Sequence, residues 1–517
     1  MNSTATEGAR TPLGSLRTVA WSIALCFALP RGAAAAPGGP VDTLADTSLT
    51  HFVLVTNVFT TSSGSSAYLS PLSMLDGIVH TNGELRFSGN PAFTDTVSSS
   101  SGRAWFFNAG SPVELAADHN GSTDVPSFAK GFVRSAPYVV LPTNAYAQQA
   151  AALGISGWSG PLTSSQIDAL LSIGGNAPPP NGIYFPNYNG ALTGGFYVQG
   201  DLSQCRAWCD TIGGAQWIRM VQGSTTKTVL VDWANDRTKV WNGTSTSGTP
   251  NLTFYGTPPM FVIYVSGSVL DVSGPARLSG VAPPAISRGT QLHVVALGDI
   301  VVQGDLTCES FGTSSNVLGI FTPGGAVRIG TAAPADLRLD AFVLATSPVY
   351  GEFTVDSWDS GAPRGTLHLR GGVAEYFYGP FCTFDGYGML QSGYARELRH
   401  DGRGVVPPYY PFVARAVADV APAPQPPPSL RLATPFPSPS SGSVRVRYVL
   451  PRDEAVRLQV IDLSGRRIAT LVDGRQSAGD HEAVWGGSGV RRARPGLYLL
   501  RIDAGGEHAV RRVVLAR

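Results

Sequence analysis

Residues 196–204 read FYVQGDLSQ and residues 300–308 read IVVQGDLTC, so the pentapeptide VQGDL occurs twice in the chain. In both copies a short apolar run precedes a glycine and an aspartate. Alternation with a period of two puts every second side chain on one face of a strand, and the glycine permits a tight corner. The two copies therefore predict short β-strands that end at sharp turns.

Looser versions of this pattern recur along the chain, at Ile78–Gly89, Ile263–Gly274, Ala326–Gly330 and Leu367–Val373. Strands too short to stand alone can stack, so that each buries its apolar face against the next. We therefore predict a mainly β fold with a solenoid-like (β-helix-like) body over residues 42–413. The spacing of the copies is irregular, so a sandwich or a pair of β-domains stays open as an alternative.

One segment, at about residues 143–173, interrupts the β pattern and predicts a small helical insertion. Thr143 is a candidate N-cap for a helix that ends at Gly154. Thr163 is followed three residues later by Gln166, which is the capping-box spacing of a second helix. We expect both helices to cover one end or flank of the β-body.

The composition agrees with many strands and turns. Charged residues make up 14% of the 517 residues, while Gly (61) and Pro (39) are frequent. Average soluble chains carry about 25% charged residues. Residues 436–517 contain 14 Arg, no Lys and 8 acidic residues, a net charge of +6, which leaves −5 for residues 1–435. The basic C-terminal stretch could meet an anionic surface, although a solvated strand face is the simpler interpretation.

The first 36 residues have the pattern of a secretory signal peptide. Arg10 and Arg17 precede the apolar stretch Val19–Leu29, and small residues follow at Ala33–Ala36. The apolar stretch is shorter than the roughly 20 residues that span a bilayer, so no transmembrane segment is predicted. We expect the protein to be extracellular or on the outer cell surface. Nucleic acid is not an expected partner of an exported chain that lacks a basic-aromatic platform.

Four cysteines follow the predicted signal peptide, namely Cys205, Cys209, Cys308 and Cys382. In an oxidising compartment they predict disulfides, although four thiols allow three connectivities. The favoured pairs are Cys205 with Cys209 and Cys308 with Cys382. A metal site built on the CRAWC spacing would need further ligands, and no His lies nearby. We therefore predict no metal and no other cofactor.

The chain lacks the common catalytic motifs, since neither H-E-x-x-H nor G-x-S-x-G occurs. For a histidine beside an aspartate, a structural contact is the simpler interpretation than a catalytic pair. The candidates in polar, turn-like contexts are Asp76 with His80, Asp118 with His119 and Asn120, and His400. Aromatic residues that could form a sugar-stacking surface, or equally fill the core, are Trp105, Phe106, Phe107, Tyr184, Phe185, Tyr188, Tyr376, Tyr378, Tyr409 and Tyr410. We predict a non-enzymatic protein.

Specific marks of a known family are HTNG and SGNPAF within residues 76–93 and PPYYP at residues 407–411. Through these and other segments, most of the body resembles a family of exported bacterial proteins defined only as a domain of unknown function. The resemblance implies architecture and no catalytic residues. Some relatives are linked to type IV pilus assembly, but this chain lacks the long apolar N-terminal helix of a pilin. The segments that carry the resemblance are Asp76–Phe93, Gly195–Leu202, Val294–Leu306, Leu318–Gly330 and Gly393–Pro411.

The C-terminal part, residues 436–517, follows a proline-rich linker predicted over residues 414–435. Apolar and polar residues alternate regularly in VRVRYVL, RLQVIDL and LYLLRI, which predicts a small antiparallel sandwich. This part resembles the C-terminal sorting domain of the type IX secretion system and the related Ig-like domain of the flagellar hook-capping protein. The resemblance implies an Ig-like sandwich that engages the secretion machinery. The matching positions are Asp462, Gly465, Arg466, Arg467, Gly479, Trp485, Gly496 and Tyr498.

Three functions from different classes remain as hypotheses. The first is an exported structural or adhesive surface protein with a C-terminal sorting module. The second is a β-helix protein that binds or cleaves glycans, with cell-surface glycan as its partner. The third is a pilus-associated subunit.

Overall fold

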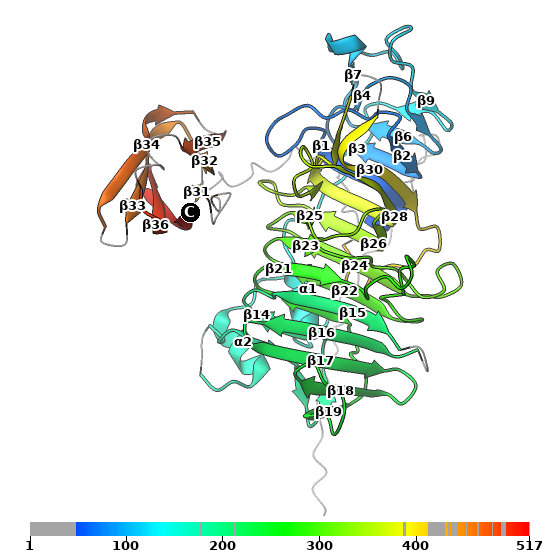
Figure 1. The fold of residues 1–517 in the computed structure, drawn as a ribbon, viewed down its shortest axis with the longest axis vertical. Coiled ribbons are helices and arrows are strands. Elements are labelled where there is room, and N and C mark those ends of the chain that lie inside the picture. Colours follow the sequence, from blue (N-terminus) through cyan, green and yellow to red (C-terminus); the bar gives the residue numbers. More distant parts are fainter. Residues whose placement is uncertain are drawn as a thin grey trace, which may run out of the picture. The chain divides into compact units, whose positions relative to one another are not determined.

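A computed structural model describes residues 48–175, 178–210, 214–385, 389–411, 430–432, 435, 440, 443–450, 452–462, 465–477, 479–486 and 493–515. The chain is mainly β, as predicted, and divides at residue 415 into two compact units (Figure 1). We refer to the first unit as the body and to the second as the C-terminal unit. The predicted signal peptide and nearly all of the predicted linker lie outside the described residues.

Two large sheets build the body, and a small third sheet contains β4 (Arg86–Phe87), β7 (Ala104–Phe106) and β8 (Val113–Leu115). The 16-stranded sheet contains β1 (Phe52–Val58), β2 (Ser73–Asp76), β3 (Ile78–Thr81), β5 (Ala92–Phe93), β6 (Val97–Ser99), β9 (Ser127–Phe128), β10 (Phe132–Val133), β11 (Gly182–Tyr184), β14 (Phe196–Gln199), β20 (Val262–Val265), β22 (Gln291–Ala296), β24 (Val317–Thr322), β26 (Arg338–Ala345), β28 (Pro363–Phe377), β29 (Cys382–Phe384) and β30 (Leu390–His400). The 11-stranded sheet contains β12 (Asn187–Tyr188), β13 (Ala191–Leu192), β15 (Gln204–Cys209), β16 (Gln216–Gln222), β17 (Thr225–Asp232), β18 (Arg237–Asn242), β19 (Leu252–Tyr255), β21 (Val269–Ser273), β23 (Ile300–Val302), β25 (Val327–Ile329) and β27 (Phe353–Val355).

Consecutive strands alternate between the two large sheets from β20 to β28. The even-numbered strands pair in parallel in the 16-stranded sheet, and the odd-numbered strands pair in parallel in the 11-stranded sheet. By contrast, β15 to β19 form an antiparallel meander that extends the 11-stranded sheet. Figure 1 shows these strands stacked along the body.

The two VQGDL copies mark the passage of the chain from one large sheet to the other. The first copy ends β14 of the 16-stranded sheet, and the second ends β23 of the 11-stranded sheet. Gly200 has a φ of +87°, which a side chain would disfavour. Aspartates at such corners accept the backbone N–H of a residue in a neighbouring turn of the chain. These pairs are Asp201 with Ser268 (2.7 Å), and Asp299 with Ala326, Asp305 with Arg338 and Asp336 with Thr366 (each 2.9 Å).

The core of the body lies on both faces of the 16-stranded sheet. In β20, Ile263 and Val265 belong to a cluster that also contains Ile218 and Met220 of the 11-stranded sheet. The alternate residues of β20, among them Tyr264, belong to a second cluster on the opposite face. Because strands of this kind are buried on both faces, their sequences are continuously apolar.

Two α-helices occur in the described residues, together with the 3₁₀ turns η1 (Leu49–His51) and η2 (Asn108–Gly110). Helix α1 (Tyr146–Ala152) packs against β14 and β20 and contributes to the second cluster. It begins after Ala145 rather than Thr143, so the predicted cap is wrong there. Helix α2 (Ser164–Leu171) begins with the predicted capping box of Thr163 and Gln166. Neither helix is long and apolar enough to cross a membrane.

The C-terminal unit contains two small antiparallel sheets. The strands of the first are β31 (Arg431–Leu432), β32 (Val444–Leu450) and β35 (Gly479–Trp485); those of the second are β34 (Arg467–Gln476), β33 (Glu454–Asp462), β36 (Gly496–Ala504) and β37 (Glu507–Leu515). Residues of both sheets share one apolar cluster, in which Val446 and Trp485 meet Leu458 and Leu500. This agrees with the predicted small antiparallel β-module.

Candidate functional site

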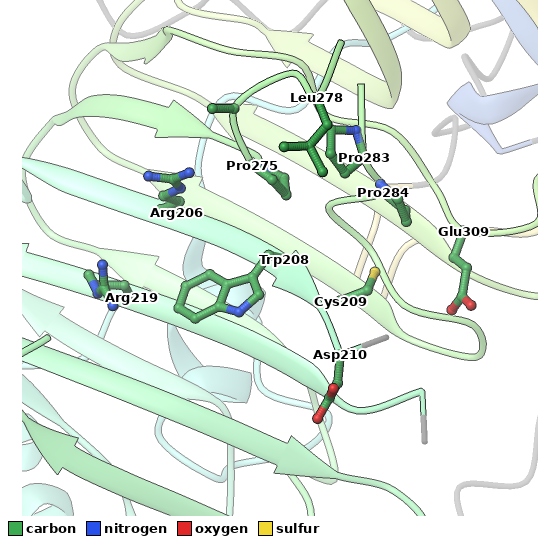
Figure 2. A pocket seen from close by; sticks show the side chains of 11 residues that line it. Arg206, Trp208, Cys209, Asp210, Arg219, Pro275, Leu278, Pro283, Pro284 and Glu309 are labelled. Atoms are coloured by element: carbon green, nitrogen blue, oxygen red, sulfur yellow. The ribbon is translucent and has the colours of Figure 1, made fainter. Parts of the chain in front are cut away.

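A cavity of about 630 Å³ lies on the outer face of the 11-stranded sheet, and we call it the groove (Figure 2). Its volume is in the range of small-ligand pockets, about 300–1,000 Å³. The lining residues come from β15, β16 and the two segments that follow β21 and β23. They are Arg206, Trp208, Cys209, Asp210, Arg219, Pro275, Ala276, Leu278, Pro283, Pro284 and Glu309.

Strand alternation explains why arginine and tryptophan face the groove. In β15, Cys205 and Ala207 are buried in the core, so Arg206 and Trp208 point to the other face. In β16, the same alternation places Arg219 outward. The antiparallel register puts Arg206 directly opposite Arg219. Two cations thus lie side by side beside an aromatic ring.

Three tryptophans form a row across this outer face. Trp208 and Trp217 are register partners whose ring planes are 2° apart, with centroids separated by 5.7 Å. Trp241 follows at 5.6 Å from Trp217. The guanidinium of Arg219 lies 5.3 Å from the centroid of the Trp208 ring, within cation–π range. These contacts hold Trp208 in place at the centre of the groove.

Neither guanidinium is neutralised by a carboxylate of the described residues. Arg219 donates to Thr228 Oγ1 at 3.2 Å and to the carbonyl oxygen of Thr244 at 3.0 Å, both neutral acceptors. Burial and the neighbouring charge of Arg206 lower the pKa of Arg219. The side chain of Arg206 forms no hydrogen bond or ion pair with the described part of the chain. Like charges directly opposite each other on adjacent strands are destabilising.

The segment between β21 and β22 forms the apolar wall of the groove. Leu278 and Val281 close a turn with two backbone hydrogen bonds of 2.9 Å, and Leu278 is 70% exposed. The neighbouring Arg277 fixes this segment to the body by a bidentate pair with Asp305, at 2.6 and 2.9 Å. Because Asp305 is buried, the pair is well shielded from solvent. The wall is therefore anchored at its base while its apolar tip faces solvent.

The opposite end of the groove is acidic. Figure 2 shows Asp210 and Glu309 on the side of Trp208 that lies away from Arg206 and Arg219. Glu309 Oε2 accepts the backbone N–H of Arg288 at 2.9 Å. The groove thus has a basic end, an aromatic centre and an acidic end.

All four predicted disulfide cysteines are free thiols in the structure, so the favoured pairs are not formed. Cys205 and Cys209 lie four residues apart on one extended strand, which separates their Cα atoms by about 13 Å. A disulfide requires less than about 7 Å. Burial, and next the charge of Glu309, raise the pKa of Cys209 to about 12. Its thiol is therefore neutral near pH 7. Cys308 is buried, and Cys382 is partly buried in β29.

The histidines proposed for chemistry are held in separate structural contacts. His80 is fully buried between Ser98 (2.9 Å) and Asn82 (3.0 Å), and burial lowers its pKa. Asp76 instead accepts a hydrogen bond from Thr94. His400 lies within 2.8 Å of the carbonyl oxygen of Thr50.

The second candidate pair, Asp118 with His119, is also held in two separate contacts. Asp118 forms an ion pair with Arg134, while His119 Nδ1 accepts the backbone N–H of Gly121 at 3.1 Å. Across the described residues no group of three His, Cys, Asp or Glu side chains is arranged to hold a metal ion.

The predicted motif of the C-terminal unit forms one turn and one aromatic contact. Gly465, with a φ of +82°, lies in a turn where Asp462 Oδ1 accepts the backbone N–H of Arg466 at 2.9 Å. Trp485 and Tyr498 pack edge to face with centroids 5.3 Å apart. The remaining motif residues begin strands: Arg467 in β34, Gly479 in β35 and Gly496 in β36.

The sequence did not single out Trp208, Arg206 or Arg219. Of the aromatic residues proposed as a sugar-stacking surface, Phe106, Phe185, Tyr378 and Tyr410 are buried and Tyr188 is 73% exposed. The stretches QCRAWC and QWIRMVQ each alternate Arg or Trp with apolar residues. In both strands Arg and Trp occupy alternate positions, and this was the signal available in the sequence. The register of the hairpin then decides which of these side chains lie opposite each other.

The model of a domain of unknown function, DUF4900, matches residues 38–102. This match lies at the N-terminal end of the body and does not reach the groove. No curated protein and no solved structure matches the chain.

Proposed function

We propose that this chain is an exported, non-catalytic surface protein whose body is a β-solenoid scaffold and whose groove contacts the extracellular surroundings. The alternation of consecutive strands between two parallel-paired sheets supports the solenoid interpretation. One strand from each large sheet forms a layer, and successive layers share a continuous apolar core. Aspartates at the corners form hydrogen bonds to the backbone of the neighbouring layer. Such a scaffold is suited to presenting the groove to the extracellular surroundings.

The groove is the observation that supports an adhesive role for the body. Two arginines that have no carboxylate partner among the described residues lie beside Trp208 in an open cavity of about 630 Å³. Binding sites characteristically combine aromatic surface with a few polar groups that fix the orientation of the ligand. Binding of a surface glycan is therefore the specific form of adhesion that we favour.

Two buried acidic residues of the body have structural roles. Asp340, which is buried, forms a bidentate pair with Arg370 at 2.6 and 2.8 Å and accepts the backbone N–H of Cys308. Arg403 and Asp401 form a similar pair at 2.6–3.1 Å. The Asp340 pair joins separate segments of the scaffold, and Asp401 orients Arg403, which donates to the carbonyl oxygen of Ser314 at 2.9 Å; both are structural uses of acidic side chains.

The C-terminal unit is proposed as an Ig-like sorting module that engages the secretion machinery. This part of the proposal is supported by the two antiparallel sheets with a common core, and by the contact between Trp485 and Tyr498. It also depends on the sequence resemblance of residues 436–517 to secretion sorting domains. The proposed signal peptide at residues 1–36 is the corresponding N-terminal element.

Surface labelling of intact cells tests this function. Cells are treated with trypsin or a membrane-impermeant biotin ester, and mass spectrometry identifies the labelled peptides and both ends of the mature chain. We expect peptides of the body to be released from intact cells and the mature chain to begin after residue 36. Labelling only after lysis, together with a chain that begins at Met1, would contradict the proposal.

A further inference from the structure

The two arginines of the groove face each other at a cost to stability. Arg206 and Arg219 are register partners, which places their Cβ atoms at about 5 Å. Salt bridges elsewhere in the body show that this chain readily pairs its arginines, as in Arg277 with Asp305 and Arg370 with Asp340. Within the part of the chain that the structure describes, no carboxylate pairs with these two cations at the rim of the cavity, and an incoming anion would stabilise such an arrangement.

We propose that the groove binds an acidic saccharide, that is, a sugar chain bearing carboxylates, with the carboxylate between Arg206 and Arg219 and a sugar ring packed on Trp208. This deepens the proposed function, on which it rests. Guanidinium groups bind carboxylates through paired, charge-assisted hydrogen bonds. The indole ring supplies a large apolar surface for the C–H face of a pyranose ring.

The acidic end of the groove narrows the ligand class. Asp210 and Glu309 line the cavity on the far side of Trp208 (Figure 2). Ionised carboxylates accept hydrogen bonds and repel anions. Sugar hydroxyls are donors that suit this end, whereas a ligand with a negative charge on every unit and no donors would bring an anion against Glu309. The asymmetry therefore favours a hydroxyl-rich acidic sugar over a phosphate backbone.

The arrangement of the tryptophans also opposes single-stranded nucleic acid. Stacking of successive bases requires ring faces that are open to the ligand. Of the three tryptophans in the row, Trp208 lines the groove, whereas Trp217 packs between Trp208 at 5.7 Å and Trp241 at 5.6 Å, so the groove offers one ring and not a series of them.

The inference is tested by equilibrium binding to the purified full-length chain, followed by calorimetry and tryptophan fluorescence. The probes are oligogalacturonate, dextran of the same length, a heparin oligosaccharide and polyglutamate. We expect oligogalacturonate to bind at least about tenfold more tightly than the other three, a difference of about 1.4 kcal/mol. Added salt should weaken this binding, since the contact is ionic.

Variants assign the binding to the groove. Arg206→Gln, Arg219→Gln and Trp208→Ala should each raise the Kd for oligogalacturonate at least about tenfold. Trp208→Phe should recover part of the loss, which separates ring packing from a general defect in folding. The matched control is Arg86→Gln, because Arg86 lies 5.1 Å from the Trp105 ring but outside the groove. Its Kd should be unchanged.

Several results would overturn the inference. Dextran binding as tightly as oligogalacturonate would show that the arginines do not select the ligand. Equal or tighter binding of polyglutamate or heparin would show a general or sulfate-directed polyanion contact. Unchanged affinity of Arg206→Gln and Arg219→Gln would place any binding elsewhere. None of these results depends on where the chain resides, so they are distinct from failure of the surface-labelling experiment.

Discussion

Asp201 Oδ1 accepts a hydrogen bond of 2.7 Å from the backbone N–H of Ser268, one layer further along the body. The residue before Ser268 is Gly267, which has no side chain to obstruct the carboxylate. A Cβ atom at Gly267 would lie 2.1 Å from Asp201 Oδ1 and 2.8 Å from the backbone nitrogen of Asp201. The aspartate of one layer therefore requires a glycine in the next.

Gly267→Ala should destabilise the body by about 1–3 kcal/mol, the usual range for a side chain forced into a packed site. Chemical denaturation followed by circular dichroism measures the change. Gly402→Ala is the control, because nothing lies within 4 Å of the added Cβ. Its stability should stay within about 0.5 kcal/mol of the original chain. Equal effects of the two substitutions would argue against the Asp–Gly contact.

The buried Glu375 should make the stability of the body depend on pH. Its Oε2 accepts the backbone N–H groups of Phe353 at 2.8 Å and Gly379 at 3.2 Å, and desolvation raises its pKa from 4.5 to about 8 despite the charge of Arg396. Between these values the folded chain binds more protons than the unfolded chain. The contribution of Glu375 to stability should therefore fall as the pH rises from 4.5 to 8, with a slope of up to about 1.4 kcal/mol per pH unit. The buried His293, whose pKa is lowered from 6.5 to about 4, contributes a slope of the opposite sign below pH 6.5.

Denaturation at a series of pH values tests this titration. Glu375→Gln should remove most of the slope and should be the more stable protein above pH 8. Glu114→Gln, at a partly exposed position on β8, is expected to keep the slope. An unchanged slope in Glu375→Gln would assign the titration to another group.

Arg206→Gln should stabilise the body slightly while it weakens ligand binding. Removal of one of two opposed charges relieves about 0.2–1 kcal/mol of repulsion. Arg328→Gln is the contrast, because Arg328 pairs with Asp356 at 2.7 Å and its loss should lower stability by up to about 1 kcal/mol. Thermal unfolding of both variants at low salt measures whether each substitution raises or lowers stability. A loss of stability in Arg206→Gln would indicate a structural role for this side chain.

Trp485→Ala should destabilise the C-terminal unit by about 3–5 kcal/mol, since it removes a fully buried indole and its contact with Tyr498. The adjacent Val484 is 51% exposed, so Val484→Ala should have little effect. Calorimetry of the full-length chain measures both variants. If the two lower the unfolding transition equally, the packing described for this unit is contradicted.

The mainly β class and the turning glycines could be predicted because each depends on local alternation. The capping box at Thr163 was equally local. The start of α1 was not, since Thr143 has suitable chemistry but the helix begins only after Ala145. The pairing of Cys205 with Cys209 could not be judged from composition, which indicates how many thiols exist, because strand geometry decides which of them can meet.

The groove could not be predicted for a similar reason. Residues 206 and 219 are neighbours only through the register of β15 and β16, and the wall with Leu278 comes from a later segment. The two VQGDL copies show the same limit, because identical sequence enters the 16-stranded sheet once and the 11-stranded sheet once. Which sheet a strand joins is therefore not encoded in these five residues.

By our proposal, the body binds an acidic glycan without cleaving it. The most direct measurement incubates the full-length chain with oligogalacturonate and follows, in the same sample, the fraction bound, the number of reducing ends and the ultraviolet absorbance of unsaturated uronates. We expect bound saccharide that is recovered at its original length. New reducing ends or unsaturated products that increase with protein concentration, and that Trp208→Ala abolishes, would contradict it.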